Sequence, residues 1–345
     1  MMQTNDDIHG PPAPPLKADP AATKLGADWK HNSPLLGCRF DPSGRFVFAG
    51  AQDNSIQRWE IATGKKTALV GHQSWVRPLA FDAAAKQLIS GDCAGRMLWW
   101  DVEAETPTPL RTVEAHDGWV RGLAVSPDGK LLASCGNDNL VKLWTIDGKP
   151  LSQFAGHTRH VYNVVFHPDG QQLASGDLLG VVKHWDRTKP AALRDFDASV
   201  MHKYDTTFRA SIGGARSMTF TADGSQLALA GIINVTNAFA GIGNPAVLLF
   251  DWQSGKRGQM LQPQAAFQGT MWGVVYHPDK FWIGAAGGSG GSLWFWKPGE
   301  EKAHHAVKLP ANGRDLALHP EGIRLAIPHA DGALRIYDMT SRQLG

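Results

Sequence analysis

The stretch "AHDGWVRGLAVSPDGKLLASCGNDNLVKLWTID", Ala115–Asp147, contains three short apolar runs separated by two turn-like segments. The tetrapeptide "SPDG" at residue 126 favours a tight turn between two β-strands, because Pro and Gly supply turn dihedral angles and Asp binds nearby backbone amides. The third apolar run ends at Trp144. The stretch therefore predicts three strands that follow one another in an antiparallel meander.

The same arrangement recurs along the chain, and over the first four units an aromatic residue ends an apolar run every 41 to 44 residues. The series reads Trp59, Trp100, Trp144, Trp185, Phe250, Trp296 and Tyr337. The turns upstream read "DPSG" at 41, "SPDG" at 126, "HPDG" at 167, "TADG" at 221, "HPDK" at 277 and "HPEG" at 319, with "DAAA" at 82 as the exception. This period is that of one four-stranded propeller blade, which cannot bury its apolar faces alone. The sequence therefore predicts an all-β fold, a seven-bladed β-propeller of four-stranded antiparallel blades.

The pattern resembles the WD40-repeat family over nearly the whole chain from about residue 22, and Ala115–Asp147 is its most specific copy. In that family a His, a Ser or Thr, an Asp and a Trp form a buried hydrogen-bonded tetrad. The resemblance assigns these roles to His116, Ser134, Asp138 and Trp144. Such burial is tolerable because each polar group supplies the partner that another needs.

Other repeats depart from the tetrad pattern. The second and fourth carry three of the four residues, which are His72, Ser90 and Trp100, and His157, Ser175 and Trp185. Ala94 and Leu179 stand where Asp is expected, so the sequence predicts that both tetrads lack the carboxylate. The first repeat keeps Asp53 but has Ala49 at the hydroxyl position, and the seventh keeps Asp331. The fifth and sixth repeats have neither the His nor the Asp.

The chain divides into a Pro-rich flexible leader over residues 1–21 and a single propeller over 22–345. We place the repeats at approximately 31–70, 71–114, 115–154, 155–198, 199–267, 268–309 and 310–345. The last repeat has no fourth strand of its own, and an unpaired strand edge invites aggregation. We therefore expect "TKLGADWK", residues 23–30, to close the ring by pairing with the last blade.

Composition fits a globular protein, with 345 residues, 43% apolar residues and a formal net charge of +2. That charge favours neither nucleic acid nor an anionic membrane as partner. No apolar run approaches a membrane span and the N-terminus lacks a secretory signal, so we expect a cytoplasmic protein. Cys38, Cys93 and Cys135 lie in strand-like runs and are expected to be reduced, buried thiols.

Two aligned positions of the repeats converge on one face. The position of Arg77 reads Leu36, Arg77, Arg121, Tyr162, Arg216, Trp272 and Arg314, and the position two residues earlier reads Pro34, Trp75, Trp119, His160, Gly214, Thr270 and Asn312. In a propeller the loops before the first strands open around the channel mouth, and Arg, Trp and Tyr are enriched at binding hot spots. We predict a partner-binding surface here, named the channel rim: Trp75, Arg77, Trp119, Arg121, His160, Tyr162, Arg216, Trp272 and Arg314. The resemblance implies the same face. Alternatively, these side chains pack locally or pair with carboxylates such as Asp92.

Two insertions open on the same face. Residues 200–212 lengthen the connection between the fourth and fifth blades, and residues 231–246 lengthen the hairpin between the second and third strands of blade five. They are expected to form a wall beside the rim, apolar in part through Ile232, Ile233, Val235, Phe239 and Ile242. Alternatively, they plug the channel.

Enzymatic motifs are not found, and neither a metal site nor a cofactor is expected. His72, His116 and His157 are tetrad residues, whereas "GGSGGS", residues 287–292, lacks the Lys of a phosphate loop and is expected to be a hairpin. The sequence predicts a non-catalytic scaffold that binds a protein or peptide, acidic or phosphorylated, through Arg forks and aromatic stacking. The alternative is a small-molecule or oligonucleotide phosphate site at the channel mouth. The sequence does not predict the oligomeric state.

Overall fold

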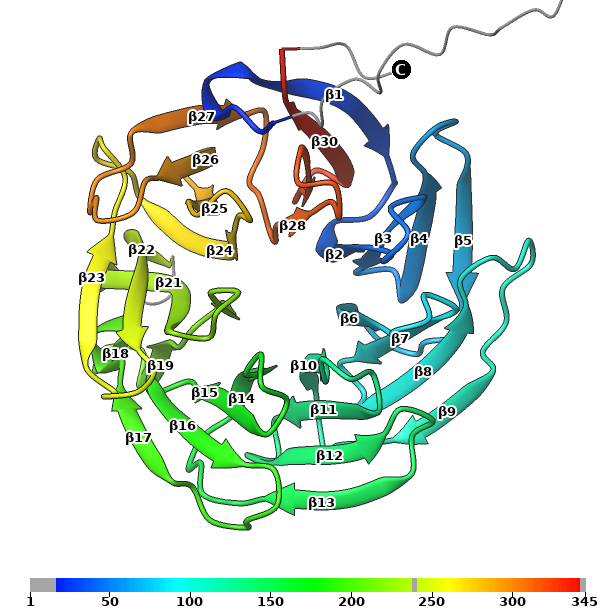
Figure 1. The fold of residues 1–345 in the computed structure, drawn as a ribbon, viewed down its shortest axis with the longest axis horizontal. Coiled ribbons are helices and arrows are strands. Elements are labelled where there is room, and N and C mark those ends of the chain that lie inside the picture. Colours follow the sequence, from blue (N-terminus) through cyan, green and yellow to red (C-terminus); the bar gives the residue numbers. More distant parts are fainter. Residues whose placement is uncertain (1–16, 238–240, 342–345) are drawn as a thin grey trace, which may run out of the picture.

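The computed structural model describes residues 17–237 and 241–341, which form seven four-stranded β-sheets arranged as blades around a common axis, and one separate two-stranded sheet (Figure 1). Each blade has four antiparallel strands, so the predicted seven-bladed β-propeller is confirmed. The turns that the sequence indicated join the first two strands of the blades. At "SPDG" the amide of Gly129, whose φ is 69°, donates to the Ser126 carbonyl over 2.8 Å.

Six blades are built from consecutive strands. Blades one to three comprise β2 Leu35–Phe40, β3 Phe46–Ala51, β4 Ser55–Glu60 and β5 Lys66–Val70; β6 Val76–Phe81, β7 Gln87–Asp92, β8 Arg96–Asp101 and β9 Arg111–Glu114; and β10 Val120–Val125, β11 Leu131–Gly136, β12 Val141–Thr145 and β13 Pro150–Phe154. Blades four to six comprise β14 Val161–Phe166, β15 Gln172–Asp177, β16 Val181–Asp186 and β17 Arg194–Asp197; β20 Ser217–Phe220, β21 Gln226–Asn237, β22 Ile242–Asp251 and β23 Arg257–Leu261; and β24 Gly269–Tyr276, β25 Trp282–Gly288, β26 Gly290–Trp296 and β27 His305–Leu309.

The seventh blade joins the two ends of the chain. Its strands are β28 Ala317–Leu318, β29 Arg324–Pro328, β30 Ala333–Met339 and, on the outside, β1 Thr23–Lys30. The predicted closing strand is therefore confirmed, and Figure 1 shows β1 beside β30. Trp29 of β1 also stacks on Trp59 of blade one, with ring centroids 6.2 Å apart. The single strand β1 thus contacts both the last blade and the first blade and closes the ring.

The expected flexible leader over 1–21 falls largely on residues 1–16, which lie outside the described residues. From residue 17 the chain is described, and Pro20–Ala22 forms the short 3-10 helix η1. The side chain of Asp19 caps it by accepting a hydrogen bond from the Ala21 amide over 3.0 Å.

Apolar side chains join each blade to the next. The described residues contain seven buried clusters, and each combines side chains of two adjacent blades. In one of them Phe48 and Ile56 of blade one pack with Leu88 and Trp100 of blade two. Burying one such side chain is worth about 1.5–3 kcal/mol, so the stacking of blades supplies much of the stability.

Blade three contains the tetrad that the resemblance assigned. His116 Nδ1 lies 2.8 Å from Asp138 Oδ1, and its Nε2 lies 2.7 Å from the Ser134 hydroxyl. The Trp144 indole donates to the same hydroxyl over 2.9 Å. Burial lowers the pKa of His116, whereas hydrogen bonds from His116 overcome the effect of burial on Asp138 and lower the pKa of that carboxyl to about 2. A neutral imidazole therefore lies between an ionised carboxylate and a hydroxyl.

Blades two and four carry complete tetrads as well, so the prediction that they lack the carboxylate is wrong. Asp92 Oδ2 lies 2.8 Å from His72 Nδ1, and Asp177 Oδ2 lies 2.9 Å from His157 Nδ1. Both aspartates end the second strand of their blade, two positions before Ala94 and Leu179. The end of the second strand adjoins the turn that carries Asp138 in blade three. A carboxylate at the strand end or in the turn can therefore reach the imidazole Nδ1.

On the face opposite the channel rim, histidines in the turns of three blades contact the backbone of the following blade. His167, His277 and His319 each approach, through Nε2, the carbonyl of a glycine in the following blade, which is Gly224 at 3.2 Å, Gly322 at 2.6 Å and Gly44 at 3.0 Å, respectively. Their Nδ1 atoms accept backbone amides two residues further on. These contacts require a proton on Nε2, and we call them the turn staples.

Candidate functional site

The channel rim is shaped by a backbone irregularity that recurs from blade to blade. In the first strands of blades one to four and six the pairing register shifts at a single place, and the residues left unpaired there include Leu36, Arg77, Arg121, Tyr162 and Trp272. A β-bulge of this kind re-aims the side chain of the extra residue. The repeated bulge therefore explains why the aligned residues turn toward the axis.

Blades five and seven present their rim residues just before the first strand. The amide of Arg216 donates to the Ala230 carbonyl over 2.7 Å, and that of Arg314 donates to the Pro328 carbonyl over 2.9 Å. Both contacts reach the second strand of the same blade. The two arginines are thereby held at the same level as the bulged residues of the other blades.

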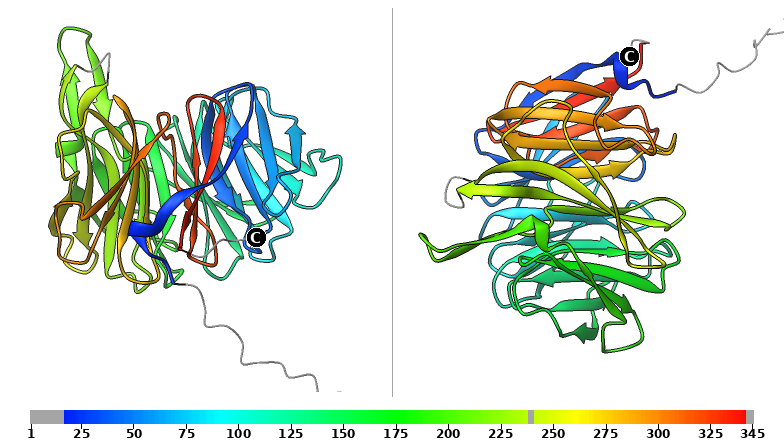
Figure 2. Two further views of the ribbon diagram at one scale, coloured as in Figure 1. Left: turned by 90° about the horizontal axis from the view of Figure 1, so that it is seen from above. Right: turned by 90° about the vertical axis from the view of Figure 1, so that its left-hand side faces the viewer.

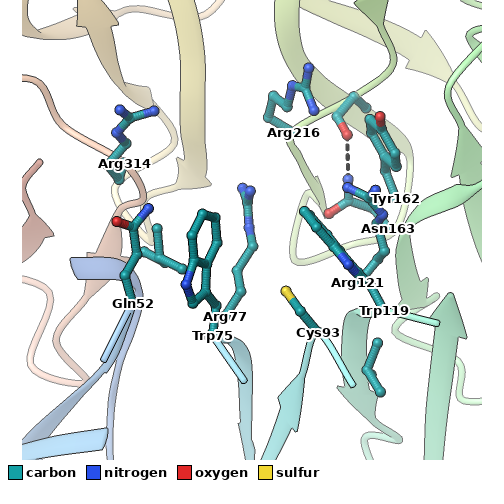
Figure 3. Close-up of a pocket in the computed structure, with 13 residues that line it drawn as sticks. Gln52, Trp75, Arg77, Cys93, Trp119, Arg121, Tyr162, Asn163, Arg216 and Arg314 are labelled. Carbon is teal, nitrogen blue, oxygen red and sulfur yellow. Dashed lines mark hydrogen bonds between the residues drawn. The ribbon is translucent and has the colours of Figure 1, made fainter. Parts of the chain in front are cut away.

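A cavity of about 180 Å³ lies at the channel mouth, and Figure 3 shows the side chains that enclose it. Its lining includes seven of the nine predicted rim residues, which are Trp75, Arg77, Trp119, Arg121, Tyr162, Arg216 and Arg314. We call it the mouth cavity. Seven of the predicted rim residues therefore lie around one cavity, and their binding of a partner stays a prediction.

The other two rim residues are placed differently. Trp272 is half-buried behind the arginines and contacts three of them through its ring. His160 does not line the mouth cavity, and its Nδ1 lies 2.8 Å from the Asn137 carbonyl. Sequence alignment also missed three polar contributors, Gln52, Cys93 and Asn163, because they come from neighbouring positions of the strands and turns.

Guanidinium groups and aromatic rings alternate around the cavity. The Arg121 guanidinium carbon lies 4.4 Å from the centroids of both Trp119 and Tyr162, and that of Arg216 lies 4.9 Å from Tyr162. On the other side the Trp272 centroid lies 5.4 Å from Arg77, 5.3 Å from Arg216 and 5.1 Å from Arg314. The ring faces attract the cations and hold them in the channel without neutralising their charge.

Positive charge in the mouth cavity has no acidic counterpart within the lining. Among the residues that the structure describes, four arginines line it and no Asp or Glu does. The carboxylate that acts most strongly on Arg77 is Asp315, deeper in the channel, which already binds Arg39 at 2.8 Å and the Cys38 amide at 3.2 Å. Asp92, considered above as a partner for the rim, is buried against His72 and Arg96 instead.

The arginines repel one another and remain charged. Burial lowers the pKa of Arg77 to about 10; Asp315 opposes this effect, and the charges of the other three arginines add to it. Burial also lowers the pKa of Arg121 and of Arg314. At pH 7 a guanidinium with a pKa of about 10 is still protonated, so the rim presents concentrated positive charge in a partly desolvated space.

Hydrogen-bonding capacity of these arginines is only partly used. Arg121 Nε donates to Asn137 Oδ1 over 2.6 Å. Arg216 Nε, in contrast, is buried without a hydrogen-bond partner among the described residues. A buried donor without a partner is costly, and the Arg216 side chain is not fixed by hydrogen bonds as that of Arg121 is.

Two tryptophans form the outer edge of the site. Trp75 and Trp119 are 43% and 38% exposed, and their ring centroids are 6.5 Å apart. Figure 3 shows both indoles beside the arginine side chains. They offer an apolar surface next to the cationic cavity, which is the combination found at binding hot spots.

The first insertion forms a hairpin of its own, β18 His202–Asp205 and β19 Ala210–Gly213, which follows the 3-10 helix η2 Ser199–Met201. The second lengthens β21 and β22 of blade five. Figure 2 shows both structures projecting from the same face of the ring, and Lys203 Nζ donates to the Val235 carbonyl over 2.8 Å to join them. Neither insertion contributes a residue to the mouth cavity, so among the described residues they stand beside the channel and do not plug it.

The apolar surface of this wall differs from the prediction. Ile232, Ile233 and Val235 are buried, because they pack inside blade five and against its neighbours, and Ile242 is half-buried. Phe239 lies outside the described residues. Tyr204 and Phe208 of the hairpin are instead 53% and 50% exposed, two aromatics that the sequence analysis overlooked.

One cysteine, Cys93, is among the described residues that line the cavity. Burial raises the pKa of its thiol to about 11, so the thiol stays protonated at pH 7. All three cysteines are free, and burial raises the pKa of Cys38 and Cys135 too. Between residues 17 and 341, leaving out 238–240, no group of three His, Cys, Asp or Glu side chains is placed to hold a metal ion. The same residues contain no helix long and apolar enough to cross a membrane.

Comparison with known protein families identifies one kind of repeat in three segments of the chain. The family model described as "WD domain, G-beta repeat" matches residues 25–60, 107–145 and 148–186. The chain is 41% identical over 113 residues to the Target of rapamycin complex subunit wat1 of Schizosaccharomyces pombe, covering 32% of this chain and 35% of that protein.

More distant relatives align over other lengths. Topless-related protein 2 of Arabidopsis thaliana is 24% identical over 370 residues, covering 97% of this chain and 30% of the relative. Protein groucho of Drosophila melanogaster is 26% identical over 162 residues, covering 45% of this chain and 22% of groucho. The chain thus spans well under half of the length of these relatives.

Proposed function

This chain is a WD40-repeat protein, and we propose that it is a non-catalytic scaffold that binds an acidic or phosphorylated segment of a protein partner on the channel rim. The similarity to proteins such as a Target of rapamycin complex subunit and groucho supports a scaffold role in protein interactions. The identity of the partner and the use of the rim are part of the proposal.

One observation carries the choice of this surface. Four arginines line the mouth cavity without a carboxylate among the lining residues, although the protein as a whole is nearly neutral. Concentrating like charges costs free energy in the unliganded protein, and an anionic ligand would recover that cost. Trp75 and Trp119 would add apolar contact at the edge, where a peptide leaving the cavity would pass.

A small-molecule or oligonucleotide ligand is the second candidate, since arginine forks bind phosphate and aromatic rings stack on bases. The mouth cavity of about 180 Å³ is smaller than the roughly 300–1,000 Å³ typical of sites for whole small molecules. The size of the cavity therefore favours a ligand that inserts one group and leaves its remainder outside.

Affinity capture from a cell extract tests the surface. Arg77→Glu/Arg121→Glu should lose partners that the wild type retains, because the substitutions replace attraction by repulsion. Trp75→Ala/Trp119→Ala should weaken capture with little change in its salt dependence, since these residues supply apolar contact. Lys130→Glu, an exposed residue in the turn between β10 and β11, is the matched control. Loss of partners in the Lys130→Glu variant with retention in the Arg double variant would show that another face binds.

A further inference from the structure

The four arginines of the mouth cavity differ in the contacts that their side chains make. Arg121 is engaged by Asn137 and by two aromatic rings. Arg77, Arg216 and Arg314 come from blades two, five and seven and surround one ring, Trp272 of blade six; we call these three residues the arginine cluster. Each guanidinium carbon lies within 5.4 Å of the Trp272 centroid, so no two of them are further apart than twice that distance.

The arginine cluster faces a shared open space. In Figure 3 the side chains of Arg77, Arg216 and Arg314 approach the mouth cavity from three directions. Arg216 Nε is buried without a hydrogen-bond partner among the described residues. Asp315, whose charge raises the pKa of Arg77, already binds Arg39 and accepts hydrogen bonds from the backbone amides of Cys38 and Leu316.

We propose that the arginine cluster is a binding site for a single phosphate group, an inference that rests on the proposed function because it names the chemistry that the rim accepts. A phosphate monoester carries about −1.5 to −2 charges at pH 7 and three strongly accepting oxygens. Three guanidinium groups from three blades offer such a tetrahedral group one fork for each oxygen. A carboxylate offers one negative charge and two oxygens in a plane, and it leaves one fork unmatched.

The size of the mouth cavity limits what else enters with the phosphate. About 180 Å³ holds a phosphate and part of its carrier but not a nucleotide. The carrier would therefore lie across the outer edge, where Trp75 and Trp119 are exposed. A phosphorylated side chain of a partner protein and free inorganic phosphate share this chemistry, and the experiment separates the two sources.

The test uses the full chain immobilised beside three degenerate peptide libraries whose fixed central residue is phosphoserine, Glu or Ser. We expect the phosphoserine library to be retained about tenfold more strongly than the Glu library. Isothermal calorimetry with inorganic phosphate gives the second arm, and added phosphate should displace the retained peptides. Binding of inorganic phosphate without retention of any library would assign the site to the free anion and overturn the peptide carrier.

Matched variants locate the binding. Arg216→Gln should lower retention of the phosphoserine library about tenfold, and Arg216→Lys should restore it only in part, because a lysine keeps the charge but not the fork. Lys130→Gln should retain the library like the wild type. A thermal melt of each variant shows whether it is folded, and Arg314→Gln provides a second member of the arginine cluster if Arg216→Gln unfolds.

The outcomes separate this inference from the proposed function. Equal retention of the Glu and phosphoserine libraries would overturn the phosphate site and leave an acidic-peptide scaffold standing. Retention of neither acidic library, with no calorimetric response to phosphate, would overturn both. Retention that survives Arg216→Gln and Arg314→Gln together would also overturn the site, because the peptide would then bind elsewhere.

Discussion

The tetrads and the channel rim are both sets of polar side chains repeated from blade to blade, yet they differ in how their charges are matched. In blade two His72 lies between Asp92 and Ser90, and Asp92 also binds Arg96 over 3.0 Å. On the rim four arginines meet with aromatic rings and no lining carboxylate. The difference teaches that the repeat neutralises the charges of one polar set inside the blade and leaves those of the other without a carboxylate beside them.

The two faces of the ring show the same division. On the face opposite the rim, the turn staples join neighbouring blades through imidazole-to-carbonyl hydrogen bonds of 2.6–3.2 Å. On the rim face, Arg216 Nε has no partner among the described residues. Substitutions should therefore separate into those that change the free energy of unfolding and those that change binding.

Removal of the closing strand should have the largest effect, because both polar sets depend on the closed ring. Deleting residues 1–30 removes β1, exposes the β30 edge and breaks the Trp29 contact with Trp59. We expect aggregation or a large drop in melting temperature, measured by light scattering and circular dichroism. Deleting residues 1–15 should leave stability unchanged; equal melting temperatures for the two deletions would contradict the closure.

Removal of tetrad carboxylates should come next, and the two blades should differ. Asp92→Ala leaves the buried His72 and the buried charge of Arg96 without a partner, which costs about 3–5 kcal/mol. Asp138→Ala should cost about 1–3 kcal/mol, because its second partner, Lys142, is more accessible to water. Urea denaturation at pH 7 measures both.

Leu179→Asp is the informative control for these tetrads. Asp177 already occupies the carboxylate position beside His157, so a second Asp should not raise the free energy of unfolding. An increase of more than about 1 kcal/mol would mean that the tetrad of blade four is incomplete.

Acid should lower the free energy of unfolding, because two buried histidines, His184 and His329, resist protonation in the folded protein. Burial lowers the pKa of His184 and of His329 to about 4, whereas unfolded histidine titrates near 6.5. The unfolded chain therefore takes up protons first, and stability that is fully present above pH 6.5 should decline as pH falls toward 4. Urea midpoints at pH 7 and pH 5 measure this decline. A His184→Gln/His329→Gln variant should show a smaller decline; an identical pH profile would contradict the assignment.

Neutralising the rim should have the smallest effect on stability. Arg216→Gln or Arg314→Gln removes a charge that other arginines repel, so we expect the free energy of unfolding to change by no more than about 0.5 kcal/mol. Urea denaturation measures it beside the peptide retention described above. A loss of more than about 2 kcal/mol would mean that these arginines hold the ring together and would remove the contrast with the tetrads.

Sequence periodicity was sufficient for the architecture. The recurring aromatic residues, the turn tetrapeptides and the missing fourth strand of the last repeat predicted seven blades and the pairing of residues 23–30 with the last blade. Local patterns suffice here because strands within a blade pair in chain order and successive blades are neighbours in the ring, so that only the closing pair of β1 and β30 joins distant parts of the sequence. Of the nine residues that the alignment placed on the rim, seven line the mouth cavity, because equivalent positions of a ring face the same axis.

Only the tertiary structure decided the partners of individual side chains. Asp92 and Asp177 complete their tetrads from a strand position that differs from that of Asp138, and Ile232 and Val235 are buried where an exposed wall was expected. The alignment placed Arg77, Arg216 and Arg314 on one face, but their convergence on Trp272 depends on bulges and side-chain directions in four separate blades. Periodicity fixes where a backbone runs, whereas a contact between side chains depends on distances of a few ångströms that are set only when the ring closes.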